Sequence, residues 1–317
     1  MIRNIVTFAM AGAVLAGCQT QAATQAAPTI ALTFDDLPVH GTAPLGETVT
    51  SSTSKIVAVL GAQKITAHGF ANGIWTIEQP STADALSQWR QAGLPLGNHG
   101  WAHRSLDAMT AAQFEDELVR NEPLLKKPGN LGWRWFRFPF LHEGKDPVKR
   151  AAARSILARH GYRIAPVTVD FSDWQWTAPY ARCLAKGDRA AVALLERTYI
   201  DAARESAVRS RQMSQALYAA DVPYVLLLHV GGMTAHMLPQ LLELYRSERF
   251  RFVTLDEAGS HPIYRADVDP ALPAGPVSLR ERAAAAKVAA PGLTNHRPAL
   301  DALCLASPNA PPSALRF

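Results

Sequence analysis

The chain has 317 residues, of which 48% are hydrophobic and 19% are charged, and this length is enough for one large domain with a sizeable core. Its net charge is +5 and its pI is near 9.2, but the sequence contains no run of Lys and Arg and no basic stripe with interleaved aromatic side chains. The composition therefore argues against a nucleic-acid-binding protein.

Residues 1–17 have the features of an export signal. Arg3 precedes an apolar stretch that is too short to span a bilayer. The stretch ends in Leu-Ala-Gly-Cys at Cys18, which resembles the lipobox of bacterial lipoproteins and implies cleavage before Cys18 and lipidation of its thiol. Gln19 at the next position implies, by the same resemblance, anchoring in the outer membrane facing the periplasm. An ordinary secretory signal with an incidental cysteine is the alternative, and residues 18–28 are expected to form a flexible tether.

Between residues 29 and 260, apolar or alternating runs typical of strands are separated by patterns typical of helices. This alternation favours parallel strands with helices outside them. The strands are expected at 29–34, 65–70, 95–98, 133–138, 163–169, 224–229 and 251–255. The helices are expected at 52–60, 82–92, 111–125, 148–160, 188–220 and 237–247.

Residues 261–317 differ from the preceding domain because Pro and Ala dominate, with one helical pattern at 279–289. We interpret them as a tail that wraps around the domain rather than as a second domain. Cys183 and Cys304 are the cysteines that remain besides Cys18. In the oxidising compartment that export implies, they are expected to form a disulfide that pins this tail, and two unpaired thiols are the alternative.

Two adjacent aspartates, Asp35 and Asp36, end the first apolar run. Neighbouring side chains of a regular strand point to opposite faces, so both carboxylates can serve one site only where the strand ends and the backbone turns. Farther along, His99 and His103 have the i, i+4 spacing that brings both imidazoles to one side of a helical turn. One Asp and two His form a ligand set for a divalent metal, and the second Asp is a candidate general base. The same ligand set occurs in non-haem iron oxygenases, which need no second carboxylate.

The ordered motifs of a known family can be recognised along the chain. Five segments resemble those of the polysaccharide deacetylases (NodB-homology domain, carbohydrate esterase family 4), and the resemblance spans roughly residues 29–258. The segments are Thr33-Phe34-Asp35-Asp36, His99-x-x-x-His103, Arg137-Phe138-Pro139-Phe140, Asp170-Phe171-Ser172-Asp173-Trp174 and Leu227-Leu228-His229. The resemblance implies an incomplete or distorted (β/α) barrel of about seven parallel strands with outer helices. Each segment lies at or just after the C-terminal end of an expected strand, where barrel folds carry their active sites.

The resemblance also assigns roles to the first three segments. It implies that Asp36, His99 and His103 bind one divalent metal ion, with Zn²⁺ as the first choice and Co²⁺, Ni²⁺ or Mn²⁺ as alternatives. It implies that Asp35 is the general base for the attacking water and that Arg137 pairs with Asp35 and fixes its rotamer.

The last segments supply the expected acid and the pocket walls. By the same resemblance, His229 protonates the leaving amine, Asp173 holds its imidazole in the right tautomer, and the backbone amide of Phe140 binds the oxyanion. Leu227 faces the same way as His229 by strand period and is expected to line the acetyl pocket. Trp174 is expected to form a pocket wall, with core packing as the alternative.

The sequence departs from the family pattern at Gly100, where a Ser or Thr commonly braces the ligand loop. We expect Asn98 or Trp101 to compensate. Several polar residues that follow the motifs are candidates for the cleft rim or for substrate contacts, with solvated positions as the alternative. They are His40, His142, Glu143 and His236.

The sequence therefore predicts a lipid-anchored, metal-dependent hydrolase that removes N-acetyl groups from amino sugars of a polysaccharide and releases acetate. Peptidoglycan or another N-acetylglucosamine polymer is the expected substrate, and the protein is expected to be an exported monomer that binds no nucleic acid. One alternative is an O-acetyl esterase of the acetylxylan type. Another is a catalytically silent glycan-binding lipoprotein, although every catalytic position is filled.

Overall fold

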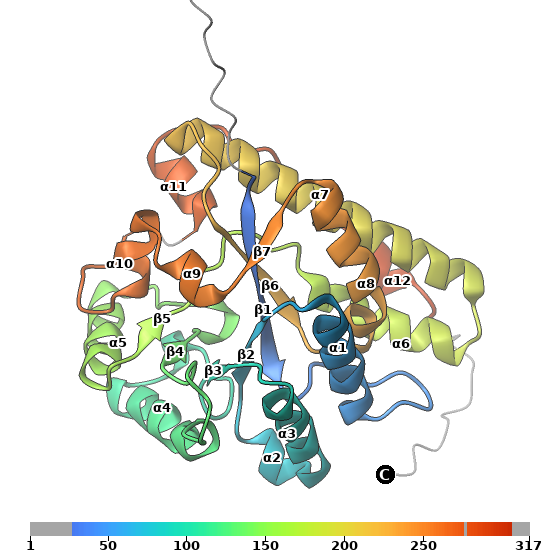
Figure 1. Cartoon of the computed structure of the whole chain (residues 1–317), viewed down its shortest axis with the longest axis horizontal. Coiled ribbons are helices and arrows are strands. Elements are labelled where there is room, and N and C mark those ends of the chain that lie inside the picture. The colour runs from blue at the N-terminus through green and yellow to red at the C-terminus, as the bar shows by residue number, and fades with distance from the viewer. Residues whose placement is uncertain (1–26, 276–277, 306–317) are drawn as a thin grey trace, which may run out of the picture.

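The computed structural model describes residues 27–275 and 278–305 of the chain. The expected export signal and the lipid-carrying Cys18 lie outside the described residues. Within them, a curled sheet of seven parallel strands is surrounded by helices (Figure 1). The fold is a distorted (β/α) barrel, which confirms the predicted fold class.

The central strand of the sheet is β1 (Thr29–Leu37), which is buried along almost its whole length. It pairs with β6 (Tyr224–His229), β2 (His68–Ala71) and β7 (Arg251–Val253). Its early residues pair with β7, and its last residues pair with β2. The sheet continues from β2 through β3 (Leu96–Asn98), β4 (Trp135–Phe136) and β5 (Arg163–Ile164).

The alternation of side chains along β1 separates the outer core from the barrel interior. Ile30, Leu32 and Phe34 belong to the large apolar cluster that includes residues of the surrounding helices. Ala31 instead belongs to a smaller cluster with residues of β2, β4, β6 and β7, inside the curled sheet. Asp35 has the same strand parity as Ala31, so its carboxylate faces the interior at the C-terminal end of the barrel.

The chain after β5 closes the barrel in a way that the sequence pattern did not predict. The predicted strand 163–169 is wrong in its second half, because β5 ends at Ile164. Pro166 has no N–H to donate to a neighbouring strand, and the chain leaves the ladder there. It reaches the other side of the sheet at Val169, which forms a bridge with Leu226 of β6.

Helices occur in all six segments where they were predicted, and α6 (Thr177–Ala185) is an additional one. Capping side chains fix several helix starts: Thr110 and Gln113 form a capping box on α4, and Asp146 caps α5. The predicted helices are α1 (Val49–Gln63), α3 (Ala83–Gln91), α4 (Ala111–Leu125), α5 (Pro147–Arg159), α7 (Arg189–Tyr218) and α8 (Gly232–Ser247). The shorter helices are α2 (Trp75–Glu78), α9 (Leu255–Gly259), α10 (Arg265–Val268), α11 (Leu279–Ala285) and α12 (Arg297–Ala302).

The C-terminal region lies against the barrel helices (Figure 1). A disulfide joins Cys183 of α6 to Cys304, with a Cα–Cα distance of 5.2 Å. Arg182, next to Cys183, donates hydrogen bonds to the backbone carbonyls of Leu300 and Leu303. These contacts hold α12 beside the 3₁₀ turn η4 (Asp173–Trp176). Within 27–275 and 278–305, no helix is long and apolar enough to cross a membrane.

Candidate active site

A pocket of about 360 Å³ lies at the C-terminal ends of the barrel strands, within the size range of small-molecule sites. Most of the predicted site residues line this pocket. Arg137 lies behind the lining residue Asp35, and Asp173 lies behind His229. The lining residues are Asp35, Asp36, His40, His99, His103, Phe140, Leu141, Asp170, Trp174, Leu227 and His229.

A bulge in β1 brings the two adjacent aspartates to the same pocket. The register between β1 and β2 shifts between Phe34 and Leu37, and Asp36 has a φ of 59°, in the left-handed region. A bulge of this kind re-aims a side chain that would otherwise point to the opposite face. The predicted turn of the backbone is therefore present, although strand pairing continues to Leu37.

Asp36, His99 and His103 converge in this pocket. Oδ1 of Asp36 lies 3.5 Å from Nε2 of His99 and 3.2 Å from Nε2 of His103. This carboxylate oxygen is buried and has no hydrogen-bond partner. Together, this unpaired oxygen and the two imidazole nitrogens form the set of ligand atoms that a divalent ion such as Zn²⁺ requires. The three residues therefore fit the predicted metal ion.

The ring orientation of His99 and the protonation state of His103 also suit metal binding. Nδ1 of His99 lies 2.8 Å from the backbone carbonyl of Arg137, so it donates there and leaves Nε2 facing Asp36. Burial lowers the pKa of His103 to about 4, although the Asp36 carboxylate opposes this shift. His103 is therefore a neutral imidazole near pH 7, the form that binds metals.

Asparagine side chains brace the loop that carries His99. Oδ1 of Asn98 accepts a hydrogen bond from the N–H of Gly100 (2.9 Å) and another from Nδ2 of Asn121 (2.9 Å). Asn72 donates to the backbone carbonyl of His99. Of the two residues expected to compensate for Gly100, Asn98 therefore does so, whereas Trp101 stacks beneath the guanidinium of Arg120.

Arg137 anchors the candidate base, Asp35. Its Nη1 donates to Oδ1 of Asp35 (2.9 Å) and to Oγ1 of Thr33 (2.7 Å), and its Nη2 donates to the carbonyl of Pro166 (3.1 Å). Arg137 is fully buried, with its guanidinium 4.5 Å from the ring centroid of Phe70. The contacts fix the Asp35 rotamer and leave Oδ2 on the pocket side, 3.7 Å from Nε2 of His99.

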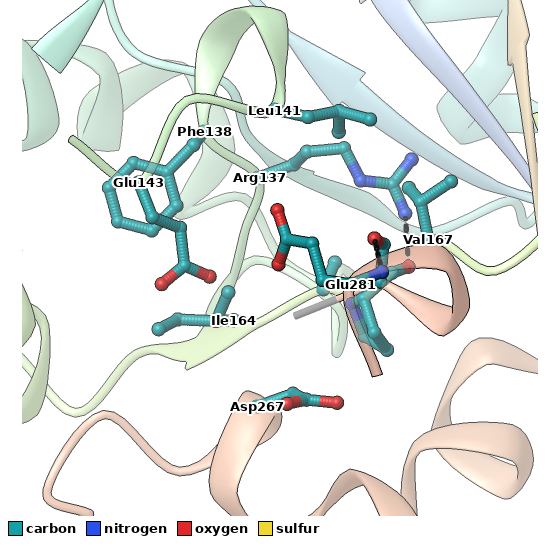
Figure 2. A pocket seen from close by; sticks show the side chains of 11 residues that line it. Arg137, Phe138, Leu141, Glu143, Ile164, Val167, Asp267 and Glu281 are labelled. Carbon is teal, nitrogen blue, oxygen red and sulfur yellow. Dashed lines mark hydrogen bonds between the residues drawn. The ribbon is translucent and has the colours of Figure 1, made fainter. Parts of the chain in front are cut away.

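Arg137 also lines a separate pocket of about 210 Å³ (Figure 2). Glu143 lines that pocket and pairs with Arg154, so it is not a wall residue of the candidate active site. His236 is also outside the candidate site, because it stacks on Tyr180 and pairs with Glu196. His142 hydrogen-bonds to Ser105, and of the additional candidates from the sequence only His40 lines the site.

Asp173 holds the candidate acid, His229. Its Oδ1 lies 2.7 Å from Nδ1 of His229, and its Oδ2 accepts from the backbone N–H of His229 and from Thr234. Burial lowers the pKa of His229, but the carboxylates of Asp173, Asp36 and Asp35 outweigh burial and raise it to about 9. His229 is therefore an imidazolium near pH 7, with Nε2 available as a proton donor.

The remaining lining residues form the pocket walls. Leu227 is buried, whereas Trp174 and Phe140 remain partly exposed at the rim, and the Phe140 ring lies 4.4 Å from the His103 ring. The backbone is left-handed at Phe140 (φ 59°), as it is at His103 (φ 50°). Asp170 also lines the pocket, although no role for it was predicted from the sequence, and burial raises its pKa. Its place in the fourth motif was the signal that pointed to it.

Comparisons with known proteins find relatives of this chain. The family model described as polysaccharide deacetylase matches residues 22–165. The chain is 24% identical over 152 residues to a chitin deacetylase of Colletotrichum lindemuthianum, a match covering 47% of this chain and 54% of the relative. It is 29% identical over 148 residues to the peptidoglycan-N-acetylmuramic acid deacetylase PdaA of Bacillus subtilis, covering 46% of this chain and 49% of the relative. These matches span about half the length of the curated relatives.

Solved structures share the fold. A chitin deacetylase structure from Colletotrichum lindemuthianum superimposes with a TM-score of 0.52 at 21% identity, covering 75% of this chain and 91% of that one. A carbohydrate esterase family 4 pseudoenzyme from Bacillus anthracis superimposes with a TM-score of 0.51 at 15% identity, covering 74% and 66%. At these identities the likeness extends to the fold alone.

Proposed function

We propose that this chain, a member of the polysaccharide deacetylase family, hydrolyses N-acetyl groups on amino sugars of a polysaccharide and releases acetate. One observation carries the proposal. A carboxylate held by Arg137 and an imidazolium held by Asp173 face the same pocket as the convergent set Asp36, His99 and His103. A base, an acid and a cation site together are what amide hydrolysis requires.

The residues of the chain divide the reaction between them. Asp35 accepts a proton from the water that attacks the acetyl carbonyl carbon. His229 then donates its Nε2 proton to the sugar nitrogen as the C–N bond breaks, so that the products are acetate and a free amine. The backbone N–H of Phe140 is the proposed donor to the oxyanion. A divalent ion bound by Asp36, His99 and His103 would polarise the carbonyl and lower the pKa of the attacking water.

The proposed substrate is peptidoglycan or another N-acetylglucosamine polymer. The two relatives are named as deacetylases of chitin and of peptidoglycan, which supports this substrate class. An imidazolium acid also suits an amine leaving group, which must be protonated to leave, better than an ester alkoxide. The O-acetyl esterase remains the alternative that the test must distinguish.

Acetate release from purified peptidoglycan, chitooligosaccharides and acetylxylan tests the proposal with the Zn²⁺-loaded protein. We expect acetate from an amide substrate, with one new primary amine for each acetate released. The Asp35→Asn variant, prepared in parallel, controls for contaminating hydrolases. Acetate from acetylxylan alone would establish the esterase instead.

A catalytically silent glycan-binding protein is the second candidate, because a family pseudoenzyme is among the similar structures. The pocket argues against it, since the base, the acid and the three metal-ligand positions are all occupied by competent side chains. Binding to chitooligosaccharides without acetate release, in protein shown to contain metal, would favour this candidate.

We also propose that the protein is lipid-anchored through Cys18 and faces the periplasm from the outer membrane. The Leu-Ala-Gly-Cys sequence supports the anchor, and the disulfide between Cys183 and Cys304 supports an oxidising compartment. Wild-type protein should incorporate labelled fatty acid, and Cys18→Ser should not. Equal labelling of both would contradict the anchor.

A further inference from the structure

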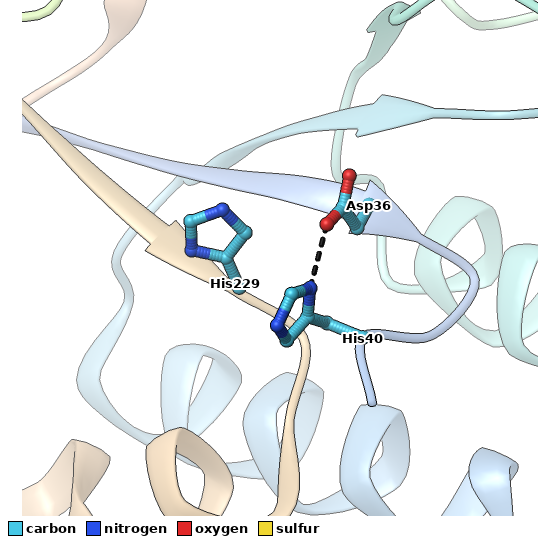
Figure 3. Close-up of side chains that lie close together, drawn as sticks. All are labelled: Asp36, His40 and His229. Carbon is cyan, nitrogen blue, oxygen red and sulfur yellow. Dashed lines mark hydrogen bonds and ion pairs between the residues drawn. The ribbon is translucent and has the colours of Figure 1, made fainter. Parts of the chain in front are cut away.

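His40 lies in the candidate active site, outside the five motifs that point to it. Its Nδ1 is 2.6 Å from Oδ2 of Asp36, and Figure 3 shows the ring beside both Asp36 and His229. The centroids of the His40 and His229 rings are 4.8 Å apart. The side chain is mostly buried, with 24% of its surface exposed.

The backbone around His40 is fixed against the end of β6. The N–H of His40 donates to the carbonyl of Val230 (2.8 Å), so the loop after β1 folds back to the strand that carries His229. Gly41 follows with a φ of +69°, and a Cβ at this position would lie 3.0 Å from Cγ2 of Thr177. A glycine is favoured at this position, because the conformation is left-handed and a side chain would be in close contact with Thr177. The loop therefore holds the backbone of His40 against the end of β6.

The two oxygens of Asp36 have different partners. Oδ1 faces Nε2 of His99 and Nε2 of His103 and has no hydrogen-bond partner. Oδ2 is occupied by His40. An ionised carboxylate only accepts hydrogen bonds, so Nδ1 of His40 is the donor. This contact prevents rotation of the carboxylate and keeps Oδ1 directed at the two imidazoles.

We propose that His40 is a positioning residue for the metal site, which holds the Asp36 carboxylate through an Nδ1–H···Oδ2 hydrogen bond. The inference rests on the proposed function, because it requires Asp36 to bind a metal. His40 also lies near enough to Asp36 and His229 for the three to hold a cation themselves. The direct bond to Oδ2 favours the positioning role, and the experiment separates the two.

The test compares two variants of nearly equal size. Asn places its amide nitrogen where Nδ1 of His stands, so His40→Asn keeps the donor, whereas His40→Leu removes it. Co²⁺ serves as the probe in the full-length metal-free protein, since its visible absorption reports both affinity and coordination geometry. We expect His40→Leu to weaken Co²⁺ binding by about 10–100-fold, as is typical when the partner of a metal ligand is removed, and to alter the spectrum. The Co²⁺ affinity of His40→Asn should stay within about 3-fold of that of the wild type.

Each outcome has a distinct meaning. Wild-type affinity in His40→Leu would overturn the proposal while leaving the proposed function intact. Equal losses in both variants, with unchanged melting temperatures of the metal-free proteins, would overturn it in favour of His40 as a direct ligand. Failure of the wild-type protein to bind Co²⁺ or Zn²⁺ would overturn the metal site itself, and with it both proposals.

Discussion

The two halves of the pocket use the same side chain for different chemistry. In the metal half (Asp36, His99 and His103), Nδ1 of His99 is held by a backbone carbonyl. In the acid half (Asp173 and His229), Nδ1 of His229 is held by a buried carboxylate. A carbonyl orients an imidazole without adding a charge, whereas a carboxylate also stabilises the imidazolium.

The pKa values of the three imidazoles are shifted by different neighbours. In the metal half, burial lowers the pKa of His103 to about 4. Burial also lowers the pKa of His99, but the Asp35 and Asp36 carboxylates outweigh burial and raise it. In the acid half, burial also lowers the pKa of His229, but Asp173 and the two site aspartates raise it to about 9. The carboxylate behind His229 therefore favours a proton on that imidazole, whereas Nε2 of His99 and Nε2 of His103 both face the Asp36 carboxylate. The following predictions test this division, beginning with the largest expected effect.

Removing a ligand from the metal half should remove metal and activity together. We expect His99→Ala to lose Zn²⁺ to background in elemental analysis and to lose activity by at least about 10³-fold, since the ion contributes several kcal/mol to the transition state. His160→Ala is the matched control, because His160 pairs with Glu115 away from the pocket. Full metal occupancy in His99→Ala would refute the ligand assignment.

The base should be separable from the metal half, although Asp35 and Asp36 are neighbours. Asp35→Asn should retain the metal and lose roughly 10²–10⁴ in rate, the usual scale of general acid–base catalysis. Metal content and kcat, measured on the same preparation, check this. If Asp35→Asn lost the metal and Asp36→Asn kept it, the two roles would be reversed.

The acid half should control the alkaline side of the pH–rate profile. His229 must be protonated to act as an acid, so kcat/KM of the wild type should fall as the pH rises through about 9. Asp173→Asn removes the strongest upward influence on the pKa of His229 and should move this alkaline limb to lower pH by about 1–3 units. Metal affinity should be unchanged. If the alkaline limb did not move in Asp173→Asn, a group other than His229 would be responsible for it.

The disulfide should stabilise the protein without affecting the metal half. Cys183 and Cys304 are 121 residues apart in sequence, and closing so long a loop contributes about 4–5 kcal/mol in the chain-entropy model. The double variant Cys183→Ser/Cys304→Ser should therefore melt on the order of 10 °C lower. Its Zn²⁺ affinity should equal that of the wild type. Two alkylatable thiols in the native wild-type protein would show that the bond does not form.

Much of the fold and of the pocket could be predicted from the sequence, because both depend on local sequence patterns. The alternation of strands and helices predicted parallel strands with outer helices, the family resemblance implied the barrel, and the polar residues at strand ends indicated the pocket. The arrangement of Arg137 behind Asp35, and of Asp173 behind His229, came from the family motifs. Their catalytic roles stay predictions until the experiments above are done.

Apart from the disulfide between Cys183 and Cys304, much of the long-range geometry could not be predicted. The apolar run 163–169 resembles a single strand, but only the closed barrel shows that Val169 pairs with β6. A loop histidine such as His40 has no periodicity that indicates its partner, and its contact with Asp36 depends on a backbone bond to Val230. Helix α6 was missed because Pro179 interrupts its pattern, although a proline in the first turn is compatible with a helix.

The left-handed backbone at Asp36, His103 and Phe140 has a consequence for protein design. Each such residue costs roughly 1–2 kcal/mol relative to ordinary backbone, and the surrounding barrel must enforce it. A designer who copies the five motifs onto straight strands of another scaffold would send Asp35 and Asp36 to opposite faces. The transferable unit is therefore the bulged strand end together with the loops packed around it, and the linear motifs without that backbone would not form the pocket.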